Sequence, residues 1–289
     1  HYPTWDQTHW DYEKGNLDAD TKRYAVAAAQ IVKQAGGHIH FFAVGRVLEQ
    51  EDVSWLEGLA KDGHPIGNHT YDHVNVKATR PDQIQFRFQR APWLIEGRSA
   101  AEVIEDNIRI TTKALKERVG ITPAGFRTPG GFNQGLSDRP DLQAMLKRQG
   151  FDWVSSKYPA HPLGKIGERP DDEVLGGIVA AQAEAQPFVY ASGLVEVPMN
   201  PISDVSAFRA GRWPHEAFLE ALRRGVGWAI ERGAVFDFLA HPSCLVVTDP
   251  QFQAIRLILD LVRDAGPRAA LVDLGTIAER ARRDAARGS

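Results

Sequence analysis

The order of apolar and polar residues predicts helices that alternate with strands along the chain. Residues 20–35 place apolar side chains near helical spacing and are followed by a glycine pair, a typical helix stop. Residues 38–45 then form the nearly continuous apolar run of a buried strand. Further helices are predicted at residues 54–62, 100–119, 140–149, 213–232, 250–265 and 276–286, and further strands at residues 124–127, 151–155, 194–199, 235–241 and 269–274.

Strands separated by helices of this length are typical of βαβ units, which assemble into parallel sheets. Because about seven such strands occur in one chain, we expect an α/β fold in which the sheet forms a closed or nearly closed barrel. Two long connections, residues 77–97 and 158–190, show no clear period, and we expect them to be functional or interfacial loops. The chain contains no internal repeat or low-complexity tract, so residues 1–289 are predicted to form a single domain.

The composition narrows the choice of partners and ligands. A net charge of -3, with Lys and Arg scattered along the predicted helices, argues against a surface for nucleic acid or an anionic membrane. No apolar run approaches the roughly 20 residues that span a bilayer. The single cysteine, Cys244, excludes a site built from several thiolates, so any metal must be bound through nitrogen and oxygen.

The opening residues, H-Y-P-T-W-D, contain neither the basic nor the apolar region of a secretory signal. On this ground a cytoplasmic location is favoured, although the first residue is His rather than Met. The compartment otherwise stays open.

Ionisable residues stand near the ends of several predicted strands, where the reactive side chains of a barrel are expected. They are Asp6, His69 with His73, Arg127, Asp152 and His241. Each has an ordinary structural alternative: Arg127 could brace a turn, Asp152 could pair with it, and His241 could be a buried histidine bonded to the backbone. Their occurrence together at successive strand ends favours an active site.

The stretch G-N-H-T-Y-D-H-V-N is the clearest candidate for metal binding. It places His69 and His73 four residues apart, so both imidazoles can face one side of a helical turn or of a similarly curled loop. A carboxylate from another strand would complete a three-ligand site with open positions for water and substrate. An isolated H-x-x-x-H also occurs often by chance, so the pair alone leaves metal binding open.

Five short motifs, in order along the chain, resemble those of the polysaccharide deacetylase (NodB-homology) family of carbohydrate esterases. They are T-W-D, G-N-H-T-Y-D-H, F-R-T-P-G-G-F, G-F-D-W and F-L-A-H. Two further stretches, L-V-E-V-P and G-T-I-A-E-R, are similar to the subgroup that contains peptidoglycan deacetylase-like proteins and metal-independent allantoinases. The resemblance implies a distorted (β/α) barrel with about seven parallel strands, and hydrolysis of N- or O-acetyl groups or of related cyclic amides.

The resemblance also implies a role for each matching residue. His69 and His73 correspond to the metal ligands of the family, usually for zinc and sometimes for another divalent ion. Asp6 corresponds to the general base, and His241 to the general acid that protonates the leaving amine. Arg127 corresponds to the residue that orients the base.

Other matching residues would support this chemistry. Asp152 corresponds to the partner that holds Arg127. Backbone N–H groups of the P-G-G turn would face the oxyanion of the tetrahedral intermediate, and two apolar side chains would line the acetyl pocket. The implied substrate-binding residues are Gly130, Gly131, Trp153 and Leu239.

The opening motif departs from the family pattern. Family members usually carry a second acidic residue, adjacent to the first or one position removed, as the third metal ligand. Here Asp6 is followed by Q-T-H-W before Asp11. Three outcomes follow: Asp6 itself binds the metal and another base is used, Asp11 or His9 supplies the third ligand, or the metal is bound weakly or not at all.

Three functions are therefore considered. The favoured one is a metal-dependent hydrolase of a non-peptide C–N bond, most simply an N-acetylated sugar, with metal-activated water as the nucleophile. The second is a metal-independent, allantoinase-like hydrolase of a cyclic amide, and the third an inactive relative that binds carbohydrate. The expected ligand is thus a carbohydrate or a small amide.

The segment F-R-F-Q-R, followed by Trp93, alternates aromatic and basic residues within the first long connection. Such a segment suits a sugar-stacking surface or a subunit contact, which would make the protein a homo-oligomer. The alternative is an apolar face packed against the core, and we favour that alternative.

Overall fold

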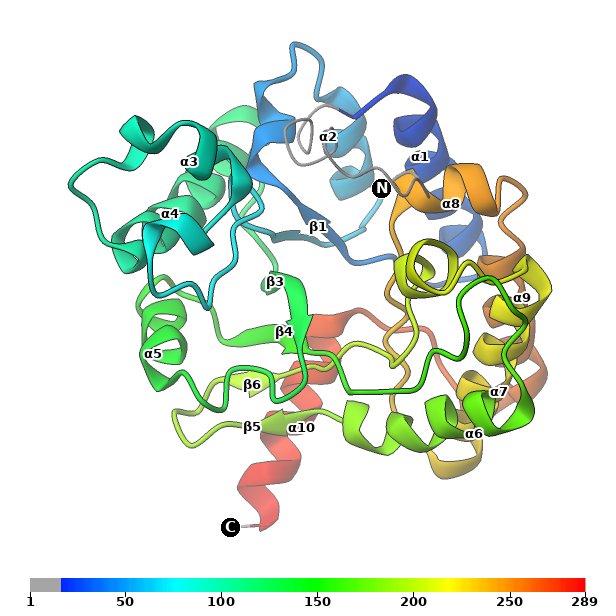
Figure 1. The fold of residues 1–289 in the computed structure, drawn as a ribbon. Helices are drawn as coiled ribbons and strands as arrows, with labels where there is room; N and C mark the ends of the chain where they lie inside the picture. Colours follow the sequence, from blue (N-terminus) through cyan, green and yellow to red (C-terminus); the bar gives the residue numbers. More distant parts are fainter. Residues whose placement is uncertain (1–16, 289) are drawn as a thin grey trace.

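A six-stranded sheet lies at the centre of the computed structural model, which describes residues 17–288 (Figure 1). The spatial order of the strands is β1-β2-β3-β4-β6-β5. Every neighbouring pair is parallel except β5 with β6, which is antiparallel. The strands are β1 (Phe41–Ala43), β2 (Ile66–Asn68), β3 (Phe126–Phe132), β4 (Trp153–Lys157), β5 (Phe188–Val189) and β6 (Val195–Glu196).

The α/β class is confirmed, and residues 17–288 form a mostly parallel sheet of six strands where about seven parallel strands were expected. The segments predicted as strands at 235–241 and 269–274 are not in the sheet. In the first of them a side chain replaces one bond of a regular ladder: the backbone N–H of Asn200 donates to the carbonyl of Asp237 (3.0 Å), but the N–H of Leu239 donates to the side-chain Oδ1 of Asn200 (2.8 Å). An amide side chain in this position interrupts the backbone-to-backbone pairing that defines a strand.

All seven predicted helices are present, with ends that differ by three residues or fewer from those expected. For example, α4 starts after a capping box between Ser99 and Glu102 and ends at Gly120, whose φ of 67° suits glycine. The confirmed helices are α1 (Ala19–Gln34), α2 (Ser54–Lys61), α4 (Ala100–Val119), α5 (Pro140–Arg148), α7 (His215–Arg232), α9 (Gln253–Ala265) and α10 (Leu274–Gly288).

Further helices occupy segments that the sequence did not predict as helical. The second long connection, for example, contains a helix that begins where the Asp171 carboxylate accepts the N–H of Val174 (2.9 Å). These helices are α3 (Phe86–Arg90), α6 (Asp172–Ala181) and α8 (Pro242–Thr248), together with short turns at Gly45–Glu49, Pro81–Gln83, Pro92–Ile95, Gln182–Ala185 and Gly266–Arg268 and a π-helix at Val205–Ala210.

Helices surround the sheet on several sides. In Figure 1, α3, α4 and α5 lie to the left of the strands, α1, α7, α8 and α9 to the right, and α10 below. A core cluster between β4, β6 and α10 contains Trp153, Val195, Val197, Leu274 and Ala278. No helix in residues 17–288 combines the length and the hydropathy needed to cross a membrane.

The aromatic and basic segment divides between core and surface. Phe88 is buried in the core, as the packing interpretation requires, whereas Trp93 is 68% exposed and Leu94 44% exposed. Arg87 forms an ion pair with Asp72, which ties α3 to the loop after β2. A homo-oligomer formed through this surface stays a prediction.

His40 is a half-buried histidine directly before β1, at the end of the strand opposite the candidate site. Its Nε2 contacts the carbonyl of Ala124 at 2.6 Å, and its ring lies against Phe42 and Trp153. Burial lowers the pKa of His40 from 6.5 to about 4, and the contact with Ala124 partly opposes that change. Between about pH 4 and pH 6.5, His40 is therefore neutral in the folded protein but protonated in the unfolded chain.

This difference predicts a loss of stability in acid. The stabilisation is fully present above pH 6.5 and is lost as the pH falls toward the folded pKa of about 4, by at most about 3 kcal/mol. Urea unfolding at a series of pH values should give a shallower decline for His40→Gln than for the wild type. The exposed His38→Gln serves as the control, and identical pH slopes for all three proteins would contradict the prediction.

Candidate active site

The loop after β2 carries the two histidines of the H-x-x-x-H motif and has a tightly defined backbone. Asn68, which is fully buried, donates from Nδ2 to the carbonyl of Ile108 (2.8 Å) and accepts the N–H of Thr70 (2.9 Å) on Oδ1. Thr70 and His73 both adopt positive φ angles, 60° and 57°. Such backbone angles are costly for residues other than glycine, and residues that adopt them cluster at functional sites.

The two imidazoles lie close together in an orientation that suits metal binding. Their ring centroids are 4.9 Å apart and the rings are nearly perpendicular. Nδ1 of His69 is 2.8 Å from the carbonyl oxygen of Arg127. Because a carbonyl can only accept a hydrogen bond, Nδ1 carries the proton and Nε2 presents its lone pair, the arrangement found for histidine ligands of metals.

The described residues supply part of a metal site. The nitrogen donors of His69 and His73 fit a borderline-soft divalent ion such as zinc. In residues 17–288 no group of three or more His, Cys, Asp or Glu side chains is arranged to hold a metal ion. The predicted further ligands, Asp6 and Asp11, lie outside the described residues, so the predictions made for them are untested.

A buried carboxylate orients the predicted general acid. Nδ1 of His241 is 2.7 Å from Oδ1 of Asp204, and the His241 N–H donates to Oδ2 of the same carboxylate at 2.7 Å. Asp204 is fully buried, whereas the His241 side chain is 29% exposed. With its Nδ1 proton directed at Asp204, His241 presents Nε2 as the nitrogen that can exchange a proton with a substrate.

Arg127 forms a buried ion pair, but with a residue other than the predicted one. Its Nη2 donates to Oδ2 of Asp237, its Nε donates to Ser155 Oγ (3.1 Å), and its guanidinium lies over the Phe42 ring at 4.6 Å. Burial raises the pKa of Asp237, and the Arg127 guanidinium opposes that rise. The carboxylate that holds Arg127 is therefore Asp237.

The prediction that Asp152 holds Arg127 is wrong. Arg127 pairs in register with Ser155 of β4, and Asp152 precedes that strand. Three strand residues span about 10 Å, so Asp152 lies toward the opposite edge of the sheet. The Asp152 side chain is 75% exposed. Its Oδ1 lies 3.9 Å from Nη2 of Arg282, a long distance for an ion pair.

The carboxyl edge of the sheet brings the remaining candidates together. The carbonyl of Arg127 contacts His69, and its guanidinium reaches Asp237, four residues before His241. His73 lies beside His69. The structure therefore places the two imidazoles of the loop, the arginine and the predicted acid at the same edge, as expected for parallel strands.

The predicted substrate-binding residues occupy different positions. Gly130 and Gly131 are exposed in an irregular part of β3, and Gly130 has a φ of 74°. Leu239 is half-buried two residues before His241. Trp153 does not join them, because it begins β4 and its side chain, 7% exposed, packs in the core with Val195 and Leu274. The structure gives Trp153 a packing role.

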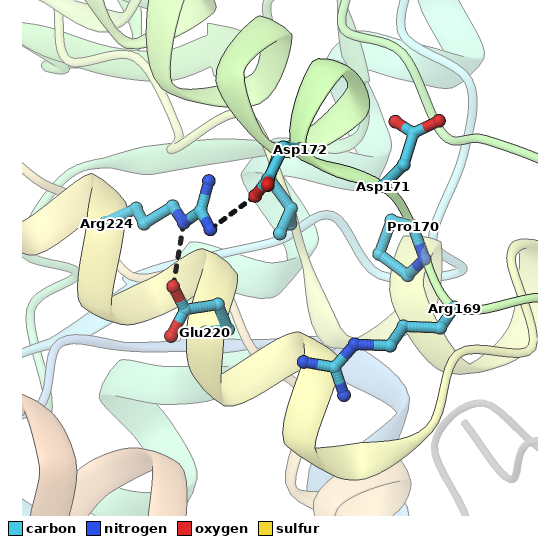
Figure 2. Close-up of a pocket in the computed structure, with 7 residues that line it drawn as sticks. Arg169, Pro170, Asp171, Asp172, Glu220 and Arg224 are labelled. Carbon is cyan, nitrogen blue, oxygen red and sulfur yellow. Dashed lines mark hydrogen bonds and ion pairs between the residues drawn. The ribbon is translucent and has the colours of Figure 1, made fainter.

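A separate surface depression of about 500 Å³ lies between α6 and α7 and contains none of the candidate residues. Figure 2 shows Arg224 between two carboxylates, Glu220 and Asp172, with a distance of 2.7 Å to each. Exposed ion pairs of this kind contribute little to stability, and the depression does not extend the candidate site.

Comparison with known proteins places these motifs in a family. Residues 12–145 match the family model described as polysaccharide deacetylase. Over this part, a little under half of its length, the chain is similar to the polysaccharide deacetylase family. The matched part contains His69, His73 and Arg127, whereas His241 and its partner Asp204 lie beyond it. The subgroup within the polysaccharide deacetylases is not resolved.

Individual relatives are distant. A chitooligosaccharide deacetylase of Azorhizobium caulinodans is 30% identical over 70 residues, which are 24% of this chain and 33% of that protein. The crystal structure of a candidate polysaccharide deacetylase from Mycobacterium smegmatis shares 17% identity over 92% of this chain and 80% of its own, with a TM-score of 0.63. A structure described as T48 deacetylase with substrate shares 15% identity over 91% of this chain and 85% of its own, with a TM-score of only 0.43.

The likeness to the Mycobacterium smegmatis structure concerns the fold. It extends over nearly the whole chain and confirms the distorted barrel expected for a polysaccharide deacetylase. The curated relative, by contrast, is matched over about a third of its length. The activity and the substrate of this chain therefore rest on its own site.

Two carboxylates of the site were missed by sequence reasoning. Asp237 stands inside the apolar run V-F-D-F-L, and a charge in a buried segment requires a partner, so a signal was present. Asp204 lies in P-I-S-D-V-S, where no periodicity or motif distinguishes it from an ordinary loop residue. Its position depends on the π-helix that follows, and π-helices have no reliable sequence signature.

Proposed function

We propose that this protein is a member of the polysaccharide deacetylase family and a metal-dependent hydrolase that removes the N-acetyl group from a sugar or polysaccharide. One observation carries the proposal: two imidazoles with the geometry of metal ligands share an edge of the sheet with a histidine oriented by a buried carboxylate. With an ion bound by the two imidazoles, this combination would provide an electrophilic centre and a proton donor on one surface, which amide hydrolysis requires.

His69 and His73 would hold the ion through nitrogen. When bound, a divalent ion supplies Lewis acidity, lowering the pKa of a water molecule and polarising the acyl oxygen. The hydrogen bond from His69 to the Arg127 carbonyl fixes the ring so that the donor nitrogen does not rotate away. The third ligand would come from Asp6 or Asp11.

His241 would act as the general acid. Addition of water to the acyl carbon forms a tetrahedral intermediate, whose C–N bond breaks to release acetate and the sugar amine. An amine leaves poorly as an anion, so a proton must reach its nitrogen as the bond breaks. Nε2 of His241 can deliver that proton, while Asp204 on Nδ1 stabilises the positive charge of the imidazolium.

Arg127 and the glycine turn would assist this reaction. Asp6 would take the proton from the attacking water. Arg127, which forms an ion pair with Asp237, would place its guanidinium beside the Asp6 carboxylate and orient it. The N–H groups of Gly130 and Gly131 would stabilise the oxyanion. An N-acetylated sugar is the proposed substrate because the curated relative is named a chitooligosaccharide deacetylase.

Metal binding tests the proposal directly. Protein stripped by a chelator and titrated with Zn²⁺ is expected to bind about one equivalent, and the ion should restore acetate release from N-acetylglucosamine oligomers. His69→Ala and His73→Ala should each weaken binding by about 100-fold or more, measured by calorimetry. His38→Ala, which removes an exposed imidazole, should bind like the wild type.

Other outcomes point to the alternative functions. Hydrolysis of a cyclic amide that persists in stripped protein would contradict the metal-dependent reaction and favour an allantoinase-like one. Zinc and oligosaccharide binding without acetate release would contradict the deacetylase and favour an inactive carbohydrate-binding protein.

A further inference from the structure

Tyr158 connects two parts of the candidate site that lie far apart in the sequence. It directly follows β4 at the carboxyl edge of the sheet. Its side chain packs so closely beneath the glycine turn that a Cβ on Gly131 would be 2.2 Å from the Cβ of Tyr158. Only glycine can therefore occupy position 131 with the backbone as it stands.

The hydroxyl of Tyr158 reaches the segment that carries Asp204. It accepts the N–H of Ser203 (3.1 Å) and lies 2.9 Å from Ser206 Oγ. Ser203 Oγ in turn accepts the N–H of Ser206 (3.1 Å) and also donates to Ser206 Oγ (3.1 Å). The three hydroxyl groups thus hold the residues on both sides of Asp204.

These bonds stabilise an unusual piece of backbone. The segment Val205–Ala210 forms a π-helix, a rare conformation that is frequent at functional sites. Ser203 is buried, with 4% of its surface exposed, so removing the tyrosine hydroxyl would take away the hydrogen bond that its N–H makes in the described structure. Burial raises the pKa of Tyr158, so the hydroxyl remains a neutral donor and acceptor.

We propose that Tyr158 is a positioning residue of the deacetylase: its hydroxyl holds the Ser203–Ser206 segment so that both Asp204 oxygens remain on His241, while its ring supports the turn at Gly131. This inference rests on the proposed function. Tyr158 would thus align the proton donor His241 with the N–H groups of the glycine turn, which would face the oxyanion. Tyr158 itself exchanges no proton with the substrate.

The test compares two tyrosines with similar buried hydroxyl bonds. Tyr190 donates to Glu196 (2.6 Å) and accepts the N–H of Leu136 (2.8 Å), but its described bonds do not include the Asp204 segment. Tyr158→Phe should lower kcat by roughly tenfold with KM unchanged, as for loss of other groups that orient a catalytic residue. Tyr190→Phe should reduce stability to a similar degree and leave kcat near the wild-type value.

A second readout is independent of turnover. The proton on Nδ1 of His241, bonded to a carboxylate, should give a downfield ¹H NMR signal that is absent in His241→Gln. That signal should broaden or shift in Tyr158→Phe and persist in Tyr190→Phe. An unchanged signal and kcat in Tyr158→Phe, or equal loss of kcat in both variants, would overturn the positioning role.

The two proposals can fail separately. If the wild type releases no acetate but the NMR signal still changes only in Tyr158→Phe, the positioning role stands and the deacetylase function is contradicted. If the wild type releases acetate and Tyr158→Phe matches it in both kcat and the NMR signal, the deacetylase function stands and the positioning role is contradicted.

Discussion

Replacing His241 by Gln is expected to lower kcat by about 10³-fold with little change in the fold. Gln can still donate a hydrogen bond to Asp204, but it cannot supply a proton to the leaving amine, and general acid catalysis is worth 10²–10⁴-fold. The effect should appear in kcat more than in KM, because the proton is needed only as the C–N bond breaks. Acetate release from N-acetylglucosamine oligomers gives the rates.

The matched control for this variant is His38→Gln, which makes the same chemical change at an exposed position outside the candidate site. It should retain the wild-type rate. Circular dichroism and thermal unfolding check that both variants are folded. Activity of His241→Gln within about tenfold of the wild type would show that another group protonates the leaving amine.

Replacing Asp237 by Ala is expected to destabilise the folded protein by about 3–5 kcal/mol. The change leaves the guanidinium of Arg127 buried, 7% exposed, without its carboxylate. Removing one partner of a buried ion pair destabilises a protein much more than replacing both partners by apolar residues, because a buried charge is then left unpaired. The free energy of unfolding in urea measures the effect.

Two further variants separate the interpretations. Asp152→Ala removes the carboxylate that the sequence assigned to Arg127, and because that side chain is 75% exposed it should change stability by less than about 0.5 kcal/mol. Arg127→Met combined with Asp237→Ala should recover part of the loss, since no unpaired charge remains. A large effect of Asp152→Ala with a small effect of Asp237→Ala would contradict the pairing described above.

The error over Asp152 shows how strand position limits sequence reasoning. G-F-D-W matched a family motif, and Asp152 stood in the segment 151–155, which was predicted as a strand and overlaps β4. The strand, however, begins one residue after the aspartate, so that residue lies toward the amino edge. An uncertainty of two or three residues in a strand end moves a side chain by about 10 Å, from one edge of a sheet to the other.

The strands predicted at 235–241 and 269–274 illustrate a related limit. Both segments are apolar enough for a strand, yet neither joins the sheet. In the first, the side chain of Asn200 takes up a backbone N–H that a regular neighbouring strand would otherwise bind. This side-chain hydrogen bond comes from a residue about 40 positions away, so no local sequence pattern reveals it.

The sequence by itself determined seven of the helices, the α/β class and the histidine motif. Their signals are local: the capping box at Ser99 and the glycine at 120 delimit α4, and four-residue spacing puts His69 beside His73. Only the tertiary structure decided the partners of the reactive residues. Asp237 and Asp204 are 110 and 37 residues from Arg127 and His241, and their pairing follows from which strand ends the barrel brings together. Burial then makes each partner necessary, because an ionised group that is removed from water without a partner greatly destabilises the folded protein.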